Sequence, residues 1–148
     1  MTKKILVSIA VLMSLQASPA TAAQQPQQPC AAGATPTPEQ TARRRQGVGL
    51  TRTINNLQVN QPGARTNKFL QQQELGTSPF ATRQTGASAE FHRSLNFTPG
   101  AELSPGWALT LELTSTGYWF MIRDKTDPCG LTFISNQDGL IFEAEPIR

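Results

Sequence analysis

Residues that usually hold metals or perform catalysis are scarce in this chain. Its 148 residues contain one histidine, His92, and two cysteines, Cys30 and Cys129. Metal sites need clusters of such side chains at ligand spacing, so we predict no metal site. No GxSxG or SxxK motif accompanies His92, so the usual sequence signals of a serine hydrolase are missing. No glycine-rich phosphate loop is present either, and we predict no cofactor. The sequence favours a non-enzymatic protein, while a small secreted hydrolase or cell-envelope enzyme that uses His92 with an Asp or Glu stays open.

The chain also lacks an apolar run long enough to cross a membrane. Its mostly apolar segment from Ile5 to Leu15 is short, whereas a membrane-spanning helix needs roughly 20 residues. Lys3 and Lys4 precede this segment, and the small residues Ala20-Thr21-Ala22 follow it. This pattern predicts a secretory signal peptide over residues 1–22, cleaved near Ala22. We therefore expect a secreted or periplasmic protein with no transmembrane anchor after signal removal.

A strong excess of one charge sign is absent as well. The net charge of the full chain is +3, and removal of Lys3 and Lys4 with the signal leaves +1. The local basic run Arg43–Arg45 is typical of a solvated helix face. We predict no nucleic-acid partner and expect a protein partner in the cell envelope or outside the cell.

The two cysteines predict one disulfide bond, because export places them in an oxidising compartment. A bridge between Cys30 and Cys129 closes a loop of roughly 100 residues and is worth about 4–5 kcal/mol in the chain-entropy model. The alternative is two free thiols. Cys30 lies in residues 23–37, a stretch rich in Pro and Gln that we predict to be a disordered linker.

The remaining residues, 38–148, are predicted to form a single α+β domain that begins with a helix. Thr37 and Gln40 form a capping-box pattern around Pro38, and the helix is expected to reach about Asn60. Its first turns, Pro38 to Gln46, are expected to project as a polar extension, since the apolar stripe lies further on. That stripe consists of Leu50, Ile54 and Leu57.

Between this helix and residue 106 the sequence predicts little regular structure before the first strand of the sheet. We predict a short helix over Asn67–Leu75, then a loop from Gly76 to Gly106. Within that loop, Ala89–Phe97 is predicted to form an edge strand. A rigid, protruding loop at 76–106 is what a secreted inhibitor presents, and this role is a further alternative.

From Trp107 onward the apolar residues alternate with a period of two, which predicts strands. Asp138-Gly139 supplies the left-handed backbone that a tight hairpin turn needs. The fold class predicted is therefore a helix packed on a four-stranded antiparallel meander, with strands at Trp107–Leu113, Tyr118–Arg123, Leu131–Ile134 and Leu140–Ala144.

The consecutive aromatic residues of the second of these strands cannot all face the helix. If Tyr118 and Phe120 face it, Trp119 and Met121 point outward and form a possible contact surface. The alternative is that the Ala89–Phe97 segment or the long loop covers them.

These features resemble the globular domains of type IV pilins and pseudopilins. The similarity rests on the helix segment RTINNLQ and on the final hairpin FISNQDGLIFEA, in which Phe133, Ser135, Gly139, Ile141 and Ala144 carry the pattern. The resemblance implies an exported pilin-like head, without the long apolar assembly helix of that family. It further implies an accessory role at a pilus or secretion apparatus.

Overall fold

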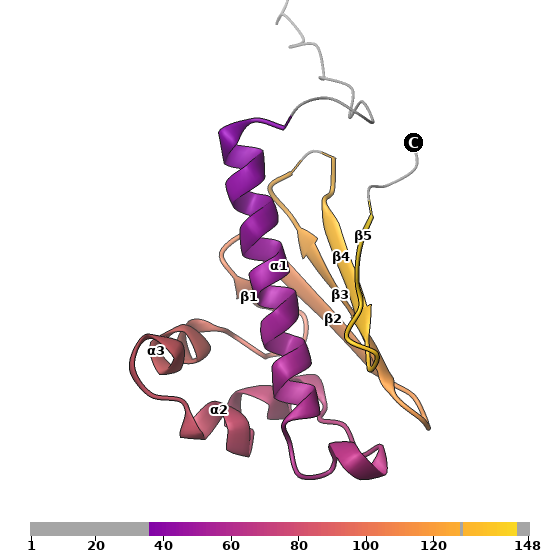
Figure 1. Cartoon of the computed structure of the whole chain (residues 1–148). Coiled ribbons are helices and arrows are strands. Elements are labelled where there is room, and N and C mark those ends of the chain that lie inside the picture. Colours follow the sequence, from indigo (N-terminus) through magenta and orange to yellow (C-terminus); the bar gives the residue numbers. More distant parts are fainter. Residues whose placement is uncertain (1–35, 128, 145–148) are drawn as a thin grey trace, which may run out of the picture.

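The computed structural model describes residues 36–127 and 129–144, and it has the predicted α+β class (Figure 1). One long helix, α1 (Pro38–Val59), lies along one face of a five-stranded antiparallel sheet. The strands follow chain order across this sheet: β1 (Glu102–Ser104), β2 (Trp107–Leu113), β3 (Tyr118–Asp124), β4 (Thr132–Asn136) and β5 (Ile141–Ala144).

The long helix begins and ends where the sequence predicts. The Thr37 side chain accepts a hydrogen bond from the Gln40 N–H at 3.1 Å, and the Gln40 side chain accepts one from the Thr37 N–H at 2.8 Å. These bonds satisfy backbone donors that the first helical turn otherwise leaves unpaired. At the other end Asn60 caps the helix just before Pro62.

The expectation that Pro38–Gln46 projects from the domain is wrong. Arg43 reaches back to the sheet, and Gly47 is buried against the rings of Phe133 and Trp107. A helix can approach a sheet this closely only where it carries no side chain. The apolar stripe therefore underestimates the length of helix that docks.

The sheet has five strands where the sequence predicts four. The additional strand β1 has three residues, of which only Leu103 is apolar, so it is too short to show a period of two. It forms because the turn before Trp107 folds it back onto β2, with Gly106 at φ +77°. Glycine adopts such positive φ angles without steric cost.

The segment between α1 and β1 differs most from the prediction. The predicted edge strand Ala89–Phe97 is instead largely a helix, α3 (Gly86–Ser94), and a short helix α2 (Pro79–Arg83) precedes it. This segment contains the good helix formers Ala87, Ala89 and Glu90, whose preference agrees with the helix that forms. The predicted helix over Asn67–Leu75 is also wrong, since 3₁₀ helices occupy Ala64–Thr66 and Gln72–Thr77.

The core lies between α1 and the sheet. The stripe Leu50, Ile54 and Leu57 is fully buried there, as predicted, against the inward side chains of β2, β3 and β4. The largest of these inward side chains are Trp107, Tyr118, Phe120, Ile122 and Phe133.

A buried polar chain crosses this core. The Tyr118 hydroxyl donates to Asn55 Oδ1 at 2.9 Å, and Asn55 Nδ2 donates to Ser135 Oγ at 2.8 Å. Burial, with a smaller effect of the Asp138 charge, raises the pKa of Tyr118 to about 12, so this hydroxyl keeps its proton. The three side chains fix the register of the helix on β3 and β4.

Several predictions concern residues outside those described. They are the signal peptide over 1–22, the linker up to residue 35, Cys30, and the end of the domain at 145–148. The disulfide between Cys30 and Cys129 therefore stays a prediction. Among the helices of the described part, none is both long enough and apolar enough to span a membrane.

Candidate functional site

The face of the sheet that points away from α1 carries exposed apolar side chains. Strand β3 alternates strictly: its even-numbered residues are buried, and Trp119 between them is 41% exposed. Met121 lies on the same outward side and is partly exposed. The structure thus places both residues of the predicted contact surface away from the helix, and no described segment covers Trp119.

Strand pairing extends this surface beyond the residues found from the sequence. Met121 pairs with Ile134 of β4, and Ile134 pairs in turn with Phe142 of β5. Phe142 is 56% exposed. We call the four side chains Trp119, Met121, Ile134 and Phe142 the outer patch.

Sequence reasoning missed Ile134 and Phe142, although a signal for them exists. The hairpin turn around Asp138-Gly139 fixes which residues of β4 and β5 face each other. In the structure Gly139 has φ +73° and its N–H donates to the Asn136 carbonyl at 3.0 Å. Because side chains in strands alternate, counting outward from this turn identifies Ile134 and Phe142 as neighbours on one face.

Charged residues flank the outer patch along the strands. Glu112 of β2 lies beside Trp119, its pairing partner on β3. Arg123 lies on the same outward side of β3, two residues beyond Met121. Both side chains are exposed, and neither takes part in a salt bridge or side-chain hydrogen bond within the described residues. The patch is therefore apolar in its centre and polar at its border, as protein interfaces are.

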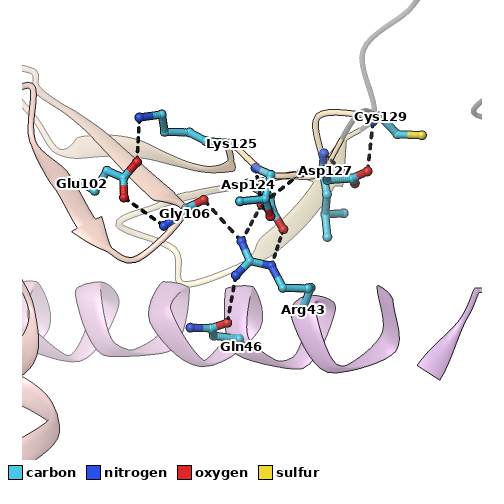
Figure 2. A network of polar contacts seen from close by, with 10 residues as sticks. Arg43, Gln46, Glu102, Gly106, Asp124, Lys125, Asp127 and Cys129 are labelled. Carbon is cyan, nitrogen blue, oxygen red and sulfur yellow. Dashed lines mark hydrogen bonds and ion pairs between the residues drawn. The ribbon is translucent and has the colours of Figure 1, made fainter. Parts of the chain in front are cut away.

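A network of charged groups joins α1 to the end of β3 and to the loop that follows it (Figure 2). Arg43 of α1 donates to both carboxylate oxygens of Asp124, from Nε at 2.7 Å and from Nη2 at 2.5 Å, and its guanidinium lies 4.6 Å from the Trp107 ring centre. Burial acts to raise the pKa of Asp124, but hydrogen bonds from Arg43 and Thr126 outweigh it and lower the pKa to about 2. The carboxylate is therefore charged throughout the physiological range.

A depression of about 280 Å³ adjoins this network, between the start of α1 and the loop after β3. Its charged lining includes Arg43, Asp124 and Asp127, which already bond to one another or to the backbone. The Cys129 N–H, for example, donates to Asp127 Oδ1 at 2.9 Å. The network consequently acts as a clamp between helix and loop.

His92, the predicted residue of the alternative enzyme, lies on α3 beside Phe80 and Phe91. Its Nδ1 is buried without a hydrogen-bond partner in the described structure. Burial lowers its pKa, and no carboxylate contributes to that shift. The surroundings of His92 thus differ from those of a general base, which an acidic partner normally orients.

Within the described residues, no group of three or more His, Cys, Asp or Glu side chains lies close enough to hold a metal ion. Comparisons of the chain with family models, with curated proteins and with solved structures found no significant match. The geometry of the chain is therefore the basis for any functional assignment.

Proposed function

We propose that this protein is an exported, non-enzymatic interaction domain, a pilin-like head that contacts a protein partner through the outer patch. The observation that carries the proposal is the contrast within β3, where alternate side chains are fully buried while Trp119 stays 41% exposed. Apolar side chains grouped on one face with a polar border are typical of interaction sites.

The pilin-like part of the proposal is supported by the α+β architecture and by the hairpin that carries Ser135 and Gly139. An accessory role at a pilus or secretion apparatus follows from that resemblance. It also agrees with the predicted signal peptide, which delivers the protein to the compartment where such assemblies are built.

The alternatives receive less support. An enzyme that uses His92 needs a carboxylate or nucleophile within hydrogen-bond reach, and the Nδ1 atom lacks any such partner in the described structure. An inhibitor that uses residues 76–106 needs a protruding loop. Leu95, Phe97 and Leu103 of that segment are instead buried in the core.

Affinity capture of the exported protein from its own cells after chemical cross-linking tests the proposal. Mass spectrometry should identify pilus or secretion components with the wild-type protein, and Trp119→Ser should reduce their recovery. Phe91→Ser is the matched control, because Phe91 is also 41% exposed but lies on α3. Equal recovery with both variants would contradict the proposal, and so would a wild-type protein that is cross-linked neither to an envelope protein nor to a second copy of itself.

A further inference from the structure

We propose that the outer patch binds the same patch on a second copy of this chain. The inference rests on the proposed function and names the partner. Its basis is that this face matches a second copy of itself. When the second copy is turned end over end by a two-fold axis that crosses the strands at right angles, apolar side chains meet apolar side chains and opposite charges meet each other.

Three rows of side chains cross the outer face. The central row contains Thr110, Met121, Ile134 and Phe142, which are successive pairing partners on β2 to β5. One flanking row contains Glu112, Trp119 and Asn136. The other flanking row contains Ala108, Arg123, Thr132 and Ala144.

A two-fold axis parallel to the central row makes the central rows of the two copies face each other. Met121, Ile134 and Phe142 then meet their counterparts, which removes the most exposed apolar surface of the sheet from water. Antiparallel sheets pack face to face with about 10 Å between them and within about 30° of alignment, so this arrangement is a standard sheet contact.

The same rotation exchanges the two flanking rows. Trp119 of one copy comes to lie over Arg123 of the other, where the guanidinium and the indole face attract each other. The neighbouring Glu112 then lies near the same Arg123, so that both charges gain a partner. Neither Glu112 nor Arg123 has a salt bridge within the described part of its own copy.

The remaining charges on this side do not oppose the pairing. Glu102 follows Ala108 in the flanking row, and Lys125 neutralises it through a salt bridge at 2.7 Å. The alternative two-fold axis, parallel to the strands and along β3, brings Arg123 toward Arg123 of the second copy and places Glu112 over Asn136, so Glu112 gains no positive partner. Like charges repel, so the end-over-end arrangement is favoured.

Sedimentation equilibrium of the purified mature protein from about 1 μM to several hundred micromolar, the range of weak protein pairs, tests this inference. We expect a monomer–dimer equilibrium. Phe142→Ser should weaken the dimer at least about tenfold, because it truncates both side chains of the contact that Phe142 makes with its own counterpart. Phe91→Ser, on α3, should leave the dissociation constant unchanged.

Charge reversal gives the sharper result. Glu112→Arg and Arg123→Glu should each weaken the dimer about fivefold, since every pair occurs twice in a symmetric complex. The double variant Glu112→Arg/Arg123→Glu should regain the ion pair but not the contact of Arg123 with Trp119, so it should bind about twofold or more tighter than Arg123→Glu alone. A double variant as weak as Arg123→Glu would overturn the end-over-end arrangement.

The inference and the proposed function fail in different ways. If the wild-type protein stays monomeric at all concentrations, the second copy is not the partner and the inference is wrong. If Trp119-dependent capture of a different envelope protein persists in that case, the proposed function stands. A dimer that Phe142→Ser leaves unchanged would also overturn the inference, because the dimer would then use another surface.

Discussion

The two faces of one sheet differ sharply, although the same strands form both. On the inner face Phe120, Ile122 and Phe133 have no exposed surface, while Trp119 and Phe142 of the outer face keep about half of theirs. The inner face is covered by α1, whose glycine and apolar stripe fit against it. The comparison teaches that similar side chains on one strand stabilise the fold on one side and stay available for binding on the other.

Polar contacts also hold α1 on the inner face. Asn55 links α1 to Tyr118 and Ser135, and Arg43 links it to Asp124. On the outer face Glu112 and Arg123 have no bonded partner within the described residues. Substitutions on the two sides should therefore affect different measurements, stability for the inner side and association for the outer side.

The largest contrast is expected between two phenylalanines on neighbouring strands. Phe133→Ala should lower the free energy of unfolding by about 3–5 kcal/mol, because it leaves a cavity in a fully buried site. Phe142→Ala should change it by less than about 0.5 kcal/mol, as exposed side chains usually do. Urea unfolding of dilute protein measures both, and similar losses would refute the distinction between the faces.

Two nearby glycines of α1 sharpen the comparison from the helix side. A Cβ at Gly47 would overlap the Phe133 ring and lie 2.7 Å from Trp107 Cη2, so Gly47→Ala should destabilise the protein by about 1–3 kcal/mol. At Gly49 nothing lies within 4 Å of such a Cβ, and Gly49→Ala should stabilise it by about 0.5–1 kcal/mol. Thermal unfolding measures both variants. If Gly47→Ala and Gly49→Ala shift the melting temperature in the same direction, Gly47 is not in close contact with the sheet.

The clamp between Arg43 and Asp124 should make stability depend on acidity. The pKa of Asp124 is about 2 in the folded protein, below its ordinary value of 3.8, so the folded state resists protonation. The resulting stabilisation, about 2 kcal/mol, is complete above roughly pH 5 and is lost as the pH falls from 4 toward 2. Asp124→Asn should remove this part of the acid dependence.

Urea unfolding at pH 6 and at pH 3 measures that effect. The wild-type protein should lose more stability than Asp124→Asn between these two values. Asp138→Asn serves as the control, because Asp138 lies in an exposed turn. An acid dependence of Asp124→Asn equal to that of the wild type would refute the role of the clamp.

The smallest effect is expected at His92, which lies on neither face of the sheet. Burial lowers its pKa below the ordinary 6.5, so the folded state favours the neutral ring. Its contribution to stability is present above pH 6.5 and decreases as the pH falls below that value. His92→Gln should abolish this dependence in melting curves at pH 7.5 and 5.5, and an unchanged dependence would implicate a different group.

Local signals in the sequence predicted the ends of α1 and the four longer strands, because each depends on neighbouring residues. The Thr37–Gln40 capping box and the alternation from Trp107 onward are such signals. The strand β1 and the helix α3 were missed or mistaken. β1 exists only through its pairing with β2, and α3 lies where a few apolar residues fit either period.

The same division holds for the candidate site. Alternation predicts that Trp119 and Met121 share one side of β3, and this side is the outward one if Tyr118 and Phe120 face the helix. Only the tertiary structure decided that Ile134 and Phe142 join them, that Gly47 packs tightly while Gly49 stays free, and that Arg43 reaches Asp124. The reason is physical: a period or a cap is set by bonds between near neighbours, whereas a patch, a close approach or an ion pair depends on which distant segments meet.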